Sequence, residues 1–256
     1  MAPGAGRRLK RPPAGLICAE VMEIPAAFAR PLRRRPTGGR GGLLAAAFLA
    51  LSALIAQAPA ATAKPLKLLT FGDSLIHGYG LAGGDTFPEQ LESALRARGY
   101  AVQVLNGGNS GDTTAAGLAR LDWALADRPD AVLIELGAND GLRGIDPKST
   151  YQNLDAILAR LAAEGLPVLL AGMLAPRNLG VDYAEAFDAV FPALAEKHGV
   201  AFYPFFLDGV AVQPALNQAD GIHPNRAGVA VIVERILPQV EALIEELPQV
   251  AGGERG

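Results

Sequence analysis

The sequence contains very little cysteine and histidine. Its single cysteine, Cys18, lies near the N-terminus, and only three histidines occur in 256 residues. A disulfide framework or a cysteine-based metal site therefore cannot be built within the chain, and we do not expect a histidine-rich metal site either. Internal repeats and low-complexity linkers are also lacking after residue 63. We therefore predict a single domain over residues 64–256.

The first 63 residues differ in composition from the rest of the chain. Residues 1–42 are rich in Arg, Pro and Gly, residues 43–58 form an apolar run, and Ala61-Thr62-Ala63 follows. A basic segment, an apolar segment and a small-residue end are typical of a secretory signal peptide. We predict cleavage near Ala63 and a periplasmic or secreted mature protein.

Two alternatives concern this leader. The apolar run is short for a membrane span, which needs about 20 apolar residues, so an uncleaved anchor is the less favoured interpretation. After cleavage, we expect no stable insertion into a membrane. The unusually long basic prelude leaves open whether the chain starts at Met1 or at Met22.

Without the leader, the chain is strongly acidic. Removing the nine basic and two acidic residues of positions 1–63 from totals of 23 and 26 leaves 14 and 24, a formal net charge of −10. Such a domain repels nucleic acid and anionic headgroups at long range, so we predict no nucleic-acid partner. Affinity for a lipid-like substrate would have to come from apolar contact.

Short apolar runs alternate with amphipathic segments through this domain. Thr86-Phe-Pro-Glu89 resembles a capping box, and it begins the first clear helix. The residues from Tyr183 to Leu194 fit one further helix, and the last helix runs from about Asn225 to Ile244 with a kink or break at Pro238. Alternation of this kind predicts a parallel sheet covered on both faces. The predicted strands are residues 66–71, 101–105, 131–136, 167–171 and 200–202.

Polar or glycine-rich segments follow the first three strands and precede the last helix. In open α/β sheets, ligands bind at the carboxyl ends of the strands, so these segments should meet at one edge. They are Gly72-Asp-Ser-Leu75, Asn106-Gly-Gly-Asn-Ser-Gly111-Asp112, Gly137-Ala-Asn-Asp140 and Asp220-Gly-Ile-His-Pro224.

Ser74 is the candidate nucleophile, because it lies just after a strand where backbone N–H groups are left unpaired. A serine hydroxyl needs a neighbouring imidazole to accept its proton, and His223 is the candidate base. Asp220, three residues before His223, can approach one ring nitrogen and stabilise the imidazolium. Asp73 and Asp208 are alternative partners for this histidine.

The remaining polar residues have other expected roles. Asn139 offers a side-chain amide and Gly111 a close backbone N–H, the two usual kinds of oxyanion donor. His198 ends a helix and is interpreted as structural, whereas His77 lies close enough to Ser74 in sequence to be a binding residue. Each of these patterns taken alone also fits an ordinary turn or cap.

The four segments together resemble the four sequence blocks of the SGNH, or GDSL, hydrolases, in the same order. The segments Glu135–Gly144 and Asp220–Arg226 are most similar to the bacterial periplasmic acyl-CoA thioesterases, lysophospholipases and arylesterases. The resemblance implies a three-layer α/β/α, flavodoxin-like fold with a five-stranded parallel sheet. It also implies oxyanion donors from Ser74, Gly111 and Asn139.

The resulting functional prediction is a serine hydrolase that cleaves acyl esters or thioesters through an acyl-enzyme on Ser74. It requires no metal and no organic cofactor. Leu142, Ile145 and Pro176 are the candidate residues for binding the acyl chain, and the resemblance implies that the loop 141–146 moves to cover it. Two alternatives are a carbohydrate O-acetylesterase and a non-catalytic lipid-binding module on the same fold.

Overall fold

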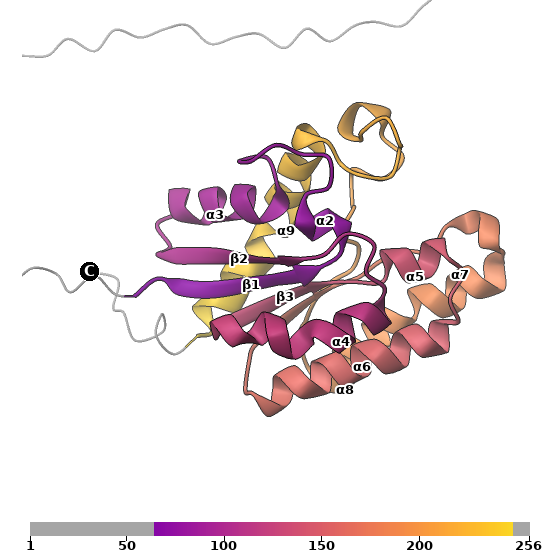
Figure 1. The fold of residues 1–256 in the computed structure, drawn as a ribbon, viewed down its shortest axis with the longest axis horizontal. Helices are drawn as coiled ribbons and strands as arrows, with labels where there is room; N and C mark the ends of the chain where they lie inside the picture. Colours follow the sequence, from indigo (N-terminus) through magenta and orange to yellow (C-terminus); the bar gives the residue numbers. More distant parts are fainter. Residues whose placement is uncertain (1–63, 248–256) are drawn as a thin grey trace, which may run out of the picture. The chain divides into compact units, whose positions relative to one another are not determined.

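The computed structural model describes residues 64–247, and Figure 1 shows how their helices and strands are arranged. The predicted leader lies outside the described residues. The strands are β1 (Leu66–Gly72), β2 (Val102–Gly108), β3 (Ala131–Glu135), β4 (Val168–Ala171) and β5 (Ala201–Tyr203). They form one parallel sheet in the order β2-β1-β3-β4-β5. The predicted five-stranded parallel sheet is therefore confirmed.

Two layers of helices cover the sheet (Figure 1). Helices α3 and α9 lie on one face, and α4, α6 and α8 lie on the other. No helix within residues 64–247 is both long and apolar enough to cross a bilayer. The helices are α2 (Ser74–His77), α3 (Phe87–Ala97), α4 (Thr114–Ala124), α5 (Ala138–Leu142), α6 (Pro147–Ala163), α7 (Val181–Asp188), α8 (Val190–His198) and α9 (Arg226–Glu245), with 3₁₀ turns at Leu125–Asp127, Arg177–Leu179 and Pro214–Leu216.

The core lies between the sheet and these helices. All five residues of β3 are buried, as expected for a central strand covered on both faces. The helices contribute their apolar stripes, and Leu154, Ile157, Leu158 and Leu161 of α6 are all fully or almost fully buried. The 3.6-residue spacing seen in the sequence is thus the spacing that packs against the sheet.

The helix boundaries differ from the sequence prediction in one place. Residues 183–194 form two helices, α7 and α8, instead of one, with Ala189 between them. Pro192 explains the interruption, because it has no N–H to donate to the carbonyl of Asp188.

The last helix also departs from expectation. The predicted break at Pro238 is wrong, because α9 continues through this residue to Glu245. Its apolar face is buried on both sides of the proline, with Leu237 and Val240 in the core. Packing of that face compensates for the hydrogen bond that the proline cannot make.

Candidate active site

Ser74 is the first residue of α2, which begins directly after β1. The Asp73 side chain caps this helix by accepting a hydrogen bond from the Leu75 N–H at 3.0 Å. Helix α2 lies close to β2, since a side chain at Gly108 would collide with the backbone of His77. The sequence therefore places the Ser74 hydroxyl at the carboxyl edge of the sheet, on a turn fixed by its neighbours.

The predicted hydroxyl, imidazole and carboxylate lie in one chain of hydrogen bonds. His223 Nε2 is 2.9 Å from Ser74 Oγ, and His223 Nδ1 is 2.7 Å from Asp220 Oδ2. The other oxygen of Asp220 accepts from the backbone N–H groups of Ile222 and His223. These backbone hydrogen bonds, followed by that from the imidazole, lower the pKa of Asp220 to about 2. Asp220 is therefore ionised wherever His223 can act as a base.

The two alternative acids make other contacts. Asp208 is paired with Arg235, and Asp73 accepts hydrogen bonds from Leu75 and Asn139. Neither side chain hydrogen-bonds to His223 within residues 64–247. The geometry thus favours Asp220 as the partner of His223.

The two other histidines lie apart from this arrangement. His198 is the last residue of α8, and its ring Nε2 is 2.6 Å from Asp155 of α6. This contact agrees with its interpretation as a structural residue. His77 ends α2, where its backbone carbonyl accepts a long hydrogen bond from Asn106. Its role as a binding residue stays a prediction.

The candidate oxyanion donors come from three separate segments. Gly111 adopts a left-handed backbone conformation, with φ of 87°, that favours glycine. Its N–H and that of Ser74 form no hydrogen bond within residues 64–247. Asn139, in the first turn of α5, donates through Nδ2 to the Asp112 carbonyl at 3.0 Å and to Asp73 Oδ2 at 3.2 Å. A substrate oxygen at this site would therefore share the Asn139 amide with one of these acceptors.

An apolar cavity of about 620 Å³ opens beside Ser74 and His223. Leu142 and Pro176, two of the candidate acyl-binding residues, line this cavity, whereas the third, Ile145, is not among its lining residues. The Ile145 carbonyl instead accepts a hydrogen bond from the Tyr183 hydroxyl at 2.9 Å. Further apolar lining residues are Leu75, Met173, Leu174, Phe205, Leu207, Val212 and Ile222.

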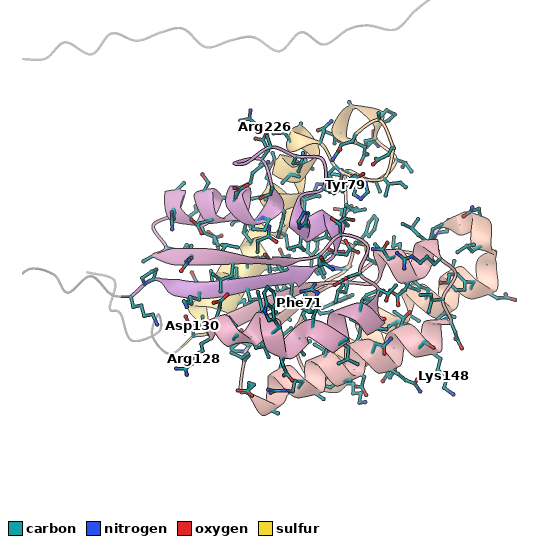
Figure 2. All side chains as sticks on the ribbon, viewed as in Figure 1. Phe71, Tyr79, Arg128, Asp130, Lys148 and Arg226 are labelled. Carbon is teal, nitrogen blue, oxygen red and sulfur yellow. The ribbon has the colours of Figure 1, made fainter. Side chains whose placement is uncertain are left out.

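Sequence reasoning missed three residues around the site. Tyr79 lies beside α2 (Figure 2), with its ring 4.6 Å from that of His223. Arg143 donates to the Gly111 carbonyl at 2.9 Å and so braces the loop that carries this candidate donor. Glu135 is fully buried at the end of β3. Only the position of Glu135, next to the Gly137 turn, could have drawn attention to it in the sequence.

Within residues 64–247, His, Asp and Glu side chains form no group of three suited to hold a metal ion. The chemistry that the described groups offer is nucleophilic attack by a hydroxyl, with an imidazole as the base. Ser74 and Asn139 both line the cavity beside the hydroxyl, which keeps their N–H groups as candidates to receive a developing negative charge.

Comparison with known proteins agrees with this chemistry. The model of the GDSL-like Lipase/Acylhydrolase family matches residues 70–231. Esterase TesA of Pseudomonas aeruginosa is 42% identical over 203 residues, which cover 79% of this chain and 98% of that protein. Thioesterase 1/protease 1/lysophospholipase L1 of Escherichia coli is 39% identical over 198 residues, covering 77% of this chain and 92% of the relative. Among solved structures, AlinE4, a SGNH-hydrolase family esterase, has a sequence 45% identical to this chain. Its crystal structure matches with a TM-score of 0.60, covering 70% of this chain and 96% of AlinE4.

Proposed function

Since the chain belongs to the GDSL-like lipase/acylhydrolase family, we propose that its ester and thioester hydrolysis proceeds through an acyl-enzyme on Ser74. One observation carries this mechanism. The continuous contact from Asp220 through His223 to the Ser74 hydroxyl, at 2.7 and 2.9 Å, is the geometry that a serine nucleophile needs.

In the first half of the reaction, His223 accepts the proton of Ser74 while Oγ attacks the acyl carbonyl carbon. Asp220 stabilises the resulting imidazolium and holds the tautomer in which Nε2 accepts. His223 then gives the proton to the departing alcohol or thiol. In the second half, water loses a proton to His223 and attacks the acyl-enzyme, and the proton returns to Ser74 as the carboxylic acid leaves.

The negative charge that develops on the carbonyl oxygen is received by three N–H groups. Two are the backbone groups of Ser74 and Gly111, which donate no hydrogen bond to another residue within the described part of the chain. The third is the Asn139 amide, which redirects one of its bonds toward the oxyanion. Donors of this kind stabilise the transition state more than the bound substrate.

The acyl group occupies the apolar cavity beside Ser74. At about 620 Å³, this cavity is within the size range of pockets for drug-sized ligands and is larger than an acetyl group requires. Its size supports medium or long acyl chains over the O-acetyl groups of a carbohydrate. The contact between Ser74 and His223 supports an enzyme over a lipid-binding module.

Export to the periplasm or the medium is part of the proposal and depends on the leader sequence. The basic, apolar and small-residue pattern up to Ala63 supports cleavage near that residue. N-terminal sequencing of native protein should then begin near Lys64. Recovery of the intact leader from a cytosolic fraction would contradict it.

The test of the activity is a hydrolysis profile of the purified protein on acyl esters and thioesters from acetyl to palmitoyl. We expect measurable turnover with both classes and a preference for chains longer than acetyl. The kcat of Ser74→Ala should be about 10⁶-fold lower than that of wild type, the size of loss typical when a serine protease loses its nucleophile. Undiminished hydrolysis by this variant would show that the nucleophile is misplaced, and activity confined to acetyl esters would favour an O-acetylesterase.

A further inference from the structure

The proposed mechanism makes no use of Glu135, a carboxyl at the centre of the fold. Glu135 ends β3, and its side chain and that of Asp73 are both fully buried. Neither carboxyl oxygen of Glu135 has a hydrogen-bond partner within residues 64–247, although the backbone N–H of Asp73 is near enough to act on the pKa of this carboxyl. A buried charge without a partner is costly, so this group requires an explanation.

Asp73 follows Gly72, the residue of β1 that pairs with Glu135 of β3, so the two buried acids are neighbours at the end of the sheet. Two ionised carboxylates in contact inside a protein repel each other, and neither can donate a hydrogen bond. A single proton resolves both problems, because a protonated carboxyl donates an O–H to the other carboxylate. Burial, reinforced by the charge of Asp73, raises the pKa of Glu135 well above its usual range, in keeping with a proton on this residue.

Asp73 in turn holds two parts of the candidate oxyanion site. Its Oδ1 accepts from the Leu75 N–H at 3.0 Å and so fixes the turn that begins with Ser74. Its Oδ2 accepts from Asn139 Nδ2 at 3.2 Å. One carboxylate thus connects the nucleophile and the amide donor, which come from helices far apart in sequence.

We propose that Glu135 is a positioning residue whose protonated carboxyl donates a hydrogen bond to Asp73, so that Asp73 holds Asn139 and the Ser74 turn in the arrangement that receives the oxyanion. This inference rests on the proposed function. It predicts that ionisation of Glu135, as the pH rises through its raised pKa, disturbs the oxyanion site, because two buried charges would then repel.

Other charged groups surround the pair without replacing this contact. His223 lies close enough to lower the pKa of Asp73. Arg120 of α4 donates to the Gly72 carbonyl and pairs with Asp112. Asp140 of α5 is engaged by Thr114. None of these side chains hydrogen-bonds to Glu135 within the described part of the chain.

Two variants of Glu135 separate donation from packing. Glu135→Gln keeps the shape and an N–H donor but cannot ionise, whereas Glu135→Met fills similar volume without a donor. At neutral pH, the Gln variant should keep kcat within about threefold, and the Met variant should lose about tenfold with KM nearly unchanged. The decline of kcat that accompanies ionisation of Glu135 at rising pH should be absent from the Gln variant. Equal kcat values and equal pH profiles for wild type and both folded variants would overturn the proposal.

A double-mutant cycle tests whether Glu135 acts through Asn139. In an Asn139→Ala background, Glu135→Met should lower kcat by less than about threefold, because the group that it positions is already absent. The same tenfold loss in both backgrounds would show that Glu135 acts elsewhere and would overturn the proposed role.

Infrared spectroscopy reports the proton directly and does not depend on catalysis. At neutral pH, wild type and Ser74→Ala should both show a protonated-carboxyl C=O band that Glu135→Gln lacks. Absence of this band from wild type would overturn the proposal. This test does not use Glu135→Met, so it remains decisive if that variant fails to fold. Full activity of Ser74→Ala with the band intact would instead contradict the proposed function and leave the shared proton standing.

Discussion

Two acidic residues belong to the surroundings of Ser74, and their environments differ. Asp220 belongs to a loop at the surface, where its side chain is 37% exposed, whereas Asp73 is fully buried beside Glu135. Backbone N–H donors and the imidazole lower the pKa of Asp220 to about 2, and burial raises that of Asp73 to about 6. An aspartate is thus ionised over the whole working pH range in the loop, whereas an aspartate in the core gains or loses its proton near pH 6. Environment, and not residue type, assigns the roles.

The contrast has opposite consequences for stability. A lowered pKa means that Asp220 stabilises the folded state above pH 3.8, and this contribution is lost as the pH falls through about 2. A raised pKa means that folded Asp73 retains a proton that the unfolded chain has released. Its contribution is therefore most favourable below pH 3.8 and is lost as the pH rises to about 6.

The largest expected effect tests the exposed side of this comparison. Asp220→Asn should lower kcat by about 10⁴, because an amide beside Nδ1 can favour the wrong tautomer of His223. Asp208→Asn is the matched control and should be close to wild type, since Asp208 pairs with Arg235. Steady-state kinetics on a short acyl ester, with circular dichroism to verify folding, measures both. A folded Asp220→Asn enzyme of normal kcat beside a crippled Asp208→Asn would reverse the assignment.

The next effect tests the group that the buried side holds. Asn139→Ala should lower kcat by roughly 10²–10³ and leave KM nearly unchanged, because its N–H contact strengthens mainly in the transition state. The check is a full kcat and KM determination on one ester and one thioester. A change confined to KM would mean that Asn139 binds substrate and does not stabilise the oxyanion.

A smaller effect should separate two roles of the exposed loop. Ile222 donates its backbone N–H to Asp220 and also lines the apolar cavity. Ile222→Ala keeps the N–H and removes apolar contact, so kcat/KM should fall about fivefold for a long acyl chain. Hydrolysis of an acetyl ester should be unchanged. Equal losses on both substrates would show that the substitution disturbs the triad instead.

The smallest effect is on stability and belongs to the buried pair. Glu135→Gln removes a group whose raised pKa destabilises the folded state increasingly as the pH rises above the usual value of 4.5. The Tm of the variant should therefore exceed that of wild type by a few degrees at pH 8, with a smaller difference at pH 5. Calorimetry at the two pH values tests the sign. A difference that grows toward pH 5 would contradict the shared proton.

Much of the fold was predictable because its signals are local. Alternating runs located the five strands, and the capping box between Thr86 and Glu89 is present at the start of α3. The errors came where local rules compete. Pro192 divides a segment that apolar spacing alone would leave continuous, whereas Pro238 is tolerated because α9 is buried on both sides of it. Sequence spacing does not show how strongly neighbouring packing compensates for a lost hydrogen bond.

For the site, the residues at strand ends were predictable, and the supporting residues were not. The Ser74, Asp220 and His223 segments could be brought together by the rule that parallel strands end at one edge. For Glu135, the only sequence signal is its position before the Gly137 turn. Its proximity to Asp73 arises from the pairing of Gly72 with Glu135 across β1 and β3, which sequence spacing does not show. Tyr79 gave no signal either, because its contact with His223 joins segments far apart in sequence.

The most direct test of the central claim is to locate a covalent adduct by mass spectrometry. A fluorophosphonate reacts with a serine that a neighbouring imidazole activates, so one equivalent should add to the native protein. Peptide mapping should place the adduct on Ser74, with Ser74→Ala unlabelled and Asp220→Asn labelled far more slowly. An adduct on any other residue, or equal labelling of Ser74→Ala, would contradict the proposed nucleophile.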